Sequence, residues 1–202
     1  KTTLLKLLLG FYPPAKGDIR AGDMNIQMMS PDLWRAQCGV VMQDGYIFSD
    51  TIARNIALGQ QDIKTDQLLY AAKMACMDDF IDQLPLGYNT LIGQEGLTLS
   101  GGEGQRILIA RAIYKNPGFL FLDEGTSALD ANNERRIMEN LQLVFRGKTV
   151  LIVAHRLSTV KNADQIIVLD KGKIVEEGKH NALIAKKGHY FNLVRNQLEL
   201  GS

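Results

Sequence analysis

Short apolar runs alternate along this chain with helical patterns and with turns rich in glycine and proline. Leucines at positions 4, 5, 7, 8 and 9 predict a helix over residues 2–9 that stops at Gly10. The runs CGVVMQ, FLFLDE, TVLIVAH and QIIVLD predict short buried strands, each ending in a polar residue. Because these runs are apolar on both faces, they favour parallel strands covered by helices. The pattern therefore predicts an α/β protein with a mostly parallel sheet.

The stretch between about residues 51 and 95 differs in its sequence pattern from the rest of the chain. It shows helical patterns and few clusters of β-branched residues, and it is interrupted by Pro85 and Gly87. We interpret it as an α-helical subdomain inserted into a core formed by residues 1–50 and 96–202. Near the end of the chain, IIVLDKGKIVEEG predicts a β-hairpin whose turn is centred on Lys171.

Composition and charge exclude several classes of partner. The chain has 202 residues, of which 46% are hydrophobic, so it can bury a substantial core. Lys and Arg number 23 and Asp and Glu 22, and a net charge of +1 gives no reason to expect a nucleic acid partner. Cys38 and Cys76 lie far apart without metal-ligand or redox spacing, which fits a reducing compartment. No apolar run approaches the ~20 residues that span a bilayer.

Polar residues at the ends of the predicted strands are candidates for one site. They are Gln43, the pair Asp123 and Glu124, and His155. Ligands of open α/β sheets bind beyond the carboxyl ends of the strands, so these side chains are expected to converge. Taken singly, each has an ordinary explanation as a polar strand end, a turn residue or the start of a helix. Together they suit metal-assisted attack of water, with one carboxylate on the cation and the next orienting the nucleophile.

A second candidate is the glycine-rich turn LSGGEGQR at residues 99–106. Ser100 is a predicted helix cap, and Gly101 and Gly102 allow backbone amides to approach a ligand closely. The residues from Glu103 onward have helical periodicity, so the turn leads into a helix N-terminus, which favours phosphate. A serine-capped helix without a ligand is the alternative, and the position of the turn shortly before FLFLDEGTSALD favours the phosphate site.

The order KTT, VVMQ, LSGGE, FLFLDEGTSALD and VLIVAHRLST resembles the nucleotide-binding domain of an ABC transporter, over essentially the whole chain. The resemblance implies a P-loop NTPase core with a helical subdomain, and ATP and Mg²⁺ as cofactors. KTT resembles the end of the Walker A loop. The first half of that loop, the strand before it and the N-terminal β region are therefore expected to be absent from this chain.

The resemblance implies specific phosphate and metal contacts. Lys1 and Thr3 correspond to Walker A residues that contact phosphate, and Thr2 to the one that binds Mg²⁺. Gln43 corresponds to the Q-loop glutamine, which senses Mg²⁺ and the attacking water. Asp123 corresponds to the Walker B aspartate on the metal.

The resemblance also implies the catalytic and dimer contacts. Glu124 corresponds to the general base and His155 to the switch histidine, which act together with Gln43. Leu99 to Glu103 match the signature motif, which in this family binds the nucleotide held by a second nucleotide-binding domain. Ser127 to Asp130 match the D-loop, and Asp130 is expected near that nucleotide. The implied partner is thus a second such domain in a head-to-tail dimer formed on ATP.

Other segments resemble exporters with fused membrane domains. They are FSDTIARNIALG after the Q-loop, IGQEG at residues 92–96 and the closing GHYFNLVRNQ. Residues 92–96 and the Q-loop are expected to contact the membrane-spanning domains at the cytoplasmic face of the inner membrane, although IGQEG is also compatible with a plain surface turn. The cargo is expected to be a peptide or bacteriocin rather than a lipid.

Two departures from the family pattern leave alternatives open. Glu103 and Gly104 stand where the family usually has Gln and then a basic residue, and the added negative charge is expected to weaken dimer closure unless Arg106 or solvent screens it. With half of the Walker A loop missing, the 202-residue chain by itself is expected to bind ATP poorly and to be inactive. A soluble ABC ATPase that remodels a ribosome or DNA is the other alternative to an exporter.

Overall fold

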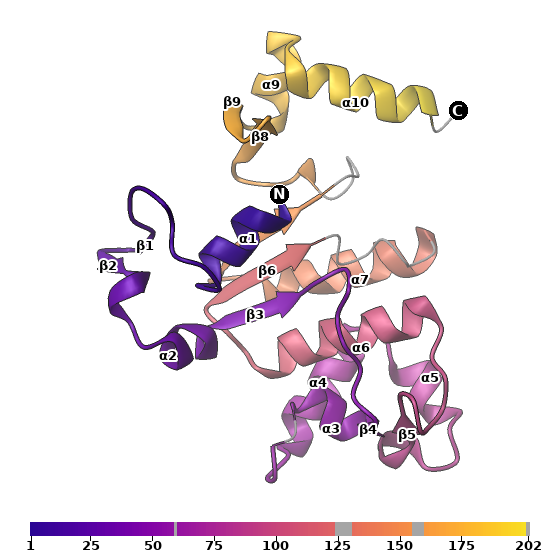
Figure 1. The fold of residues 1–202 in the computed structure, drawn as a ribbon. Helices are drawn as coiled ribbons and strands as arrows, with labels where there is room; N and C mark the ends of the chain where they lie inside the picture. The colour runs from indigo at the N-terminus through magenta and orange to yellow at the C-terminus, as the bar shows by residue number, and fades with distance from the viewer. Residues whose placement is uncertain (59, 124–130, 155–159, 201–202) are drawn as a thin grey trace. The chain divides into compact units, whose positions relative to one another are not determined.

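The computed structural model describes the chain except for residues 59, 124–130, 155–159 and 201–202. The chain forms two compact units. The larger comprises Thr2–Leu151, and the smaller comprises Ile152–Ser202 together with Lys1. Figure 1 follows the chain from the indigo N-terminus to the yellow C-terminus.

A sheet of three strands has the order β3-β6-β7. The strands are β3 (Cys38–Val41), β6 (Phe119–Asp123) and β7 (Thr149–Val153). β3 and β6 are parallel and lie side by side, with Val41 opposite Leu122. Leu120 and Leu122 are each 3% exposed, as expected for a parallel strand covered on both faces. The structure thus confirms the predicted α/β class and the parallel sheet.

Helix α1 (Thr2–Leu8) follows the leucine pattern of the sequence. Leu5 and Leu9 are buried, and the helix contacts β6. The helix ends at Leu8, one residue before the predicted end, and a turn follows that contains Gly10, which has a φ of +72°. The N–H groups of Gly10 and Phe11 donate to the carbonyls of Leu7 and Lys6, a C-terminal cap that a residue without a Cβ forms most easily.

Helix α6 (Gly101–Tyr114) is the central helix of the larger unit. Ile107 and Ile109 are fully buried, and α6 contacts β3 as well as the two helices α3 (Ile52–Ile56) and α4 (Thr65–Met74). In Figure 1, α1 and α6 lie on opposite sides of β3 and β6. β3 and β6 are therefore covered on both faces, which is why they are apolar throughout. β7 was predicted to be buried as well, but Thr149 is exposed and its other residues are only partly buried.

The stretch from 51 to 95 is mainly helical. After α3 and α4 it contains α5 (Asp78–Asp82) and the 3₁₀ turn η2 (Gly87–Asn89). Two short strands, β4 (Asp50–Thr51) and β5 (Leu91–Ile92), pair in antiparallel fashion at its two ends. The limits of the predicted helical subdomain stay a prediction.

The other elements of the larger unit lie between α1 and β3 and between β6 and β7. They are β1 (Arg20–Ala21), β2 (Met24–Asn25), η1 (Ile26–Met28), α2 (Pro31–Ala36) and α7 (Ala131–Val144). Trp34 in α2 is 5% exposed and its indole N–H donates to the carbonyl of Leu8, so α2 is attached to the end of α1. In the described part of the chain, no helix is long and apolar enough to cross a membrane.

The smaller unit contains the predicted hairpin and two helices. These elements are β8 (Ile166–Asp170), β9 (Lys173–Gly178), α9 (His180–Lys186) and α10 (His189–Leu200). Lys171 and Gly172 form the turn, both with positive φ. The apolar run of β8 predicted a strand buried on both faces, and this prediction is wrong, because Ile167 is 51% exposed. β8 pairs with β9 in antiparallel fashion, and only one of its faces packs against Leu183 and its neighbours.

Candidate functional site

The hydroxyl of Thr2 and the carboxylate of Asp123 are in direct contact. Thr2 Oγ1 donates a hydrogen bond of 2.9 Å to Asp123 Oδ2. Thr2 is the first residue of α1 and Asp123 the last of β6. Asp123 is 5% exposed, whereas Thr2 is exposed. The structure thus joins the threonine of the predicted Walker A end to the aspartate of the predicted Walker B strand.

The parallel sheet explains where these residues lie. Asp123 stands at the carboxyl end of β6, after residues buried on both faces. β3 ends at Val41, opposite Leu122, so its carboxyl end lies at the same edge of the sheet. Gln43 follows two residues later in a turn, and its side chain is exposed. Gln43 and Asp123 therefore belong to the edge at which ligands of open α/β sheets bind.

The donor set at this edge fits Mg²⁺. The hydroxyl of Thr2, the carboxylate of Asp123 and the amide of Gln43 offer oxygen atoms, the ligands that this hard cation prefers. The described residues contain no group of three or more His, Cys, Asp and Glu able to hold a metal alone.

The glycine-rich turn forms a capped helix start. Ser100 is the N-cap of α6, and its hydroxyl accepts a hydrogen bond of 3.2 Å from the N–H of Glu103. The carboxylate of Glu103 in turn accepts the N–H of Ser100 at 2.7 Å. Glu103 is thereby directed back towards the start of its own helix. Ser100 and Gly101 are exposed, so the turn is open to a ligand or partner.

Several predicted residues are placed only partly or not at all. Lys1 precedes α1 and Thr3 lies within it, and both are exposed. Glu124, Asp130 and His155 lie outside the described residues, as does all of the predicted D-loop. The phosphate contacts and catalytic roles of these residues stay predictions.

Sequence analysis missed two polar residues that contact each other, the buried Asn55 in α3 and the partly buried Arg111 in α6. Asn55 is fully buried, and burial lowers the pKa of Arg111. Arg111 donates from Nε to the carbonyl of Asn55 at 2.8 Å and from Nη1 to that of Tyr46 at 2.9 Å. A polar residue inside the apolar run IARNIAL was the only sequence signal for Asn55.

Residues 92–96, which are expected to contact membrane-spanning domains, lie beside residues 48–51, which follow the Q-loop in the sequence. β4 pairs with β5, and the N–H of Gln94 donates to Ser49 Oγ at 3.1 Å. Gly93, with a φ of +96°, lies so close to the backbone of Phe48 that a Cβ there would come within 2.8 Å of its carbonyl oxygen. The exposed rings of Tyr46 and Phe48 form an edge-to-face pair, with centroids 5.1 Å apart, on this part of the surface.

Comparison with known proteins agrees with these observations. Residues 1–127 match the protein-family model described as "ABC transporter". The chain is 46% identical over 200 residues to the leukotoxin translocation ATP-binding protein LktB of Pasteurella haemolytica-like sp. (strain 5943B), and equally to that of Mannheimia glucosida and of Bibersteinia trehalosi. Each alignment covers 99% of this chain and 28% of the relative.

Among solved structures, the chain is similar to one described as "Structure of a bacterial Atm1-family ABC exporter with ATP bound". The TM-score is 0.93 and the sequence identity 41%, over 98% of this chain and 35% of that chain. The chain therefore spans about a third, or less, of the length of the proteins that it matches.

Proposed function

The chain belongs to the ABC transporter family, and on this premise we propose that it is the ATP-binding and ATP-hydrolysing module of an exporter. The observation that carries the proposal is the hydrogen bond between Thr2 and Asp123, because it brings two motifs of the family together at the ligand-binding edge of the sheet. The similarity to proteins described as leukotoxin translocation and exporter proteins supports export over a ribosome- or DNA-remodelling role.

In this proposal, the edge of the sheet holds Mg-ATP. Thr2 and Asp123 are the metal-side residues, with Gln43 next to them, and Lys1 and Thr3 contact the phosphates. Mg²⁺ would neutralise charge on the phosphates and help to orient the attacking water. The short Thr2–Asp123 contact supports this assignment, since it needs no rearrangement to present both oxygens to one cation.

The hydrolytic step falls to residues that follow the same strands. Glu124 comes directly after Asp123 in the sequence and would accept a proton from the attacking water. His155 follows β7 and would orient the water and the γ-phosphate. Gln43 would sense Mg²⁺ and the attacking water. These roles come from the family resemblance and from the chain positions of the residues.

We further propose that the working unit is a head-to-tail dimer. The exposed turn from Ser100 to Glu103 would contact the nucleotide held by a second nucleotide-binding domain, and Asp130 would lie at the same interface. The exposure of Ser100 and Gly101 leaves this turn accessible to such a contact.

The membrane side of the proposed exporter is assigned to the Q-loop at Gln43, to residues 46–51 that follow it, and to residues 92–96. Their direct contact through Ser49 and Gln94, and the exposed rings of Tyr46 and Phe48, support a docking surface for membrane-spanning domains. The module would then work at the cytoplasmic face of the membrane. A polypeptide cargo, such as a peptide or bacteriocin, is supported by similarity to proteins of leukotoxin translocation.

The proposal is tested with the transporter that contains this sequence, reconstituted in lipid nanodiscs. We expect Mg-dependent ATP hydrolysis that Asp123→Asn reduces by ~10-fold or more, the order of a lost metal ligand or its support. Asp23→Asn, on an exposed carboxylate between β1 and β2 that belongs to none of the family motifs, is the matched control and should leave the rate unchanged. ATP hydrolysis absent from the wild type, or unaffected by Asp123→Asn, would contradict the proposal.

A further inference from the structure

We infer that Asn55 and Arg111 are positioning residues that attach the proposed docking segment, residues 46–51, to helix α6. The inference rests on the proposed function, because it concerns how the membrane side and the signature turn of the same module are connected. The segment and the helix are far apart in the sequence, and the two side chains bridge them. A partner that moves the segment would thereby move α6, whose first turn carries Ser100.

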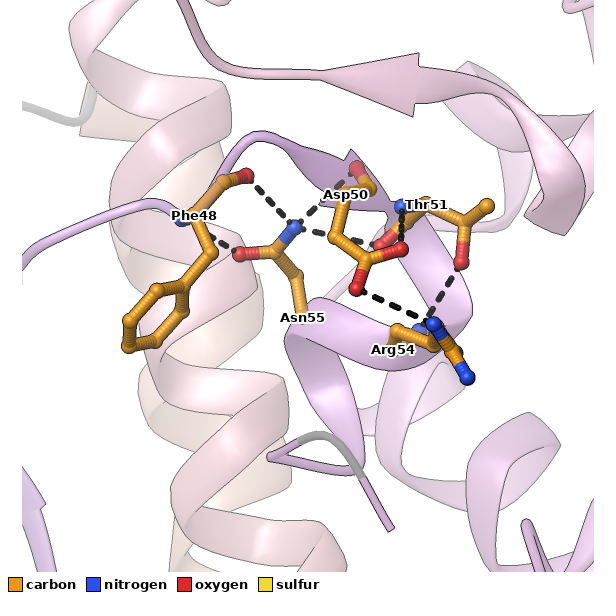
Figure 2. A network of polar contacts seen from close by, with 5 residues as sticks. All are labelled: Phe48, Asp50, Thr51, Arg54 and Asn55. Carbon is orange, nitrogen blue, oxygen red and sulfur yellow. Dashed lines mark hydrogen bonds and ion pairs between the residues drawn. The ribbon is translucent and has the colours of Figure 1, made fainter. Parts of the chain in front are cut away.

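The side chain of Asn55 holds the backbone of the segment (Figure 2). Its Oδ1 accepts the N–H of Phe48 at 2.9 Å. Its Nδ2 faces the carbonyls of Phe48, Asp50 and Thr51, at 3.0, 3.2 and 3.1 Å. One fully buried amide thus contacts four backbone groups, with its two N–H bonds shared among three carbonyls, in a segment that has only the two-residue strand β4 for regular pairing. The shape of the segment depends on this side chain rather than on a sheet.

Arg111 connects this arrangement to α6. In addition to its contacts with the carbonyls of Asn55 and Tyr46, its Nη2 donates to Asn55 Oδ1 at 3.2 Å. Three guanidinium nitrogens therefore bind three acceptors, a pattern that the single ammonium of lysine cannot reproduce. Its Cζ also lies 5.3 Å from the centre of the Phe48 ring, so the cation contacts the aromatic face of the segment.

Phe48 is the point at which an outside partner meets this network. Its side chain is 48% exposed, while its backbone N–H and carbonyl both bind Asn55 and its ring lies against Arg111. A group that presses on the exposed part of the ring therefore acts on a residue that α6 already holds. α6 then extends back from Arg111 to Ser100 over roughly 16 Å as one rigid helix.

The contacts on the outer side of the segment differ in kind. Arg54 pairs with Asp50 at 3.5 Å, and both side chains are partly exposed to solvent. Thr51 accepts the N–H of Arg54 as the cap of α3. These contacts lie within one turn of the chain and reach no part of α6. Arg54 is therefore a matched control for Arg111. It is the same residue type and lies next to the same segment, but it does not connect that segment to α6.

The first experiment compares Arg111→Lys with Arg54→Lys in the reconstituted transporter. Arg111→Lys should leave Mg-ATP affinity within about twofold, because Thr2 and Asp123 are untouched, and lower kcat by about tenfold, as expected when a catalytic group is misplaced. Arg54→Lys should leave kcat unchanged. A folded Arg111→Lys transporter with a kcat equal to that of Arg54→Lys would overturn the inference. So would a loss confined to Mg-ATP affinity, since that would indicate a general structural defect.

Amide hydrogen exchange provides the second readout, measured without nucleotide so that it is independent of activity. In Arg111→Lys, residues 46–51 should exchange about tenfold faster or more than in the wild type, while β8 and β9 keep their rates. Asn55→Asp tests the amide itself. The substitution replaces the Nδ2 donor by a carboxylate oxygen, which would be repelled by the three carbonyls that Nδ2 contacts. Faster exchange in residues 46–51 of either variant supports the inference, and unchanged exchange there in both overturns it.

A third measurement follows hydrogen exchange in the wild-type transporter and therefore does not depend on the folding of any variant. On adding Mg-ATP, the amides of residues 46–51 and of the first turn of α6 should change protection together. A change in the first turn of α6 with none in residues 46–51 would overturn the inference. If the wild type does not hydrolyse ATP, the proposed function fails, and the exchange comparison without nucleotide still decides the role of Asn55 and Arg111.

Discussion

Thr2 Oγ1 lies 2.9 Å from Asp123 Oδ2, although 121 positions separate the two residues in the sequence. The first turn of α1 and the last residue of β6 meet at one edge of the parallel sheet, and each contributes an oxygen atom. This contact supports the magnesium-side assignment of both residues.

Removing the hydroxyl of Thr2 should weaken Mg²⁺ binding in the nucleotide complex. Thr2→Val keeps the shape of the side chain and loses the oxygen, so we expect the Mg²⁺ concentration at half-maximal ATP hydrolysis to rise by ~10-fold. The measurement is a Mg²⁺ titration at fixed ATP. Thr2→Ser retains the hydroxyl and should keep the wild-type midpoint. An unchanged midpoint in Thr2→Val would exclude Thr2 as a metal-side residue.

Replacing Glu124 should separate binding from hydrolysis. Glu124→Gln retains a hydrogen-bonding side chain but cannot accept a proton, so hydrolysis should fall by ~10²-fold or more while ATP binding persists. The trapped ATP should also favour the head-to-tail dimer, which sedimentation can detect. Near-normal turnover would remove Glu124 from the role of general base, and a monomer at saturating ATP would count against a shared site.

The charge of Glu103 should oppose dimer closure, while a neutral amide at this position can keep the hydrogen bond of the helix cap. Glu103→Gln preserves an oxygen for the N–H of Ser100 and removes one negative charge beside the expected phosphate. We expect ATP-driven association to tighten by about threefold, the order of one exposed charge interaction. Glu103→Ala removes the cap as well and should destabilise α6. If Gln and Ala variants associate equally well, charge is not the property that matters.

High pH should destabilise the larger unit through Cys38. The thiol is 3% exposed and donates to the carbonyl of Trp34 at 3.2 Å. Burial raises its pKa from 9.0 to about 11, an effect that nearby Lys115 partly offsets. Because the pKa is higher in the folded state, this contribution to stability is complete below pH 9 and is lost as the pH rises towards 11.

Chemical denaturation at pH 8 to 11 measures this effect. The unfolding free energy of the wild type should fall more steeply over this range than that of Cys38→Ser, whose hydroxyl does not ionise there. Other groups that titrate between pH 9 and 11 are common to both proteins and cancel in the comparison. Parallel pH profiles would show that Cys38 has the same pKa in the folded and unfolded chains.

Local elements could be predicted because their signals lie within a few residues. The leucine pattern before Gly10 determines α1 and its end, and the apolar runs ending in Gln43 and Asp123 determine β3 and β6. Ser100 and Glu103 form a capping box because the cap and the third helical residue are always neighbours. The hairpin of β8 and β9 likewise depends on its own turn at Lys171 and Gly172.

The contacts between distant residues were decided only by the tertiary structure. No local pattern places Arg111 beside Asn55, or Gln94 beside Ser49, because each pair depends on how α3, α6 and the β4–β5 ladder pack together. The exposure of one face of β8 was likewise decided by tertiary packing, because its apolar run had predicted burial on both faces. Sequence alone determined which residues are candidates for the chemistry, since side-chain type and local periodicity are properties of the chain, and their roles stay predictions. Only the fold decided that Thr2 meets Asp123 and that buried polar groups of residues 46–51 are satisfied by Asn55, because such contacts depend on packing across the whole unit.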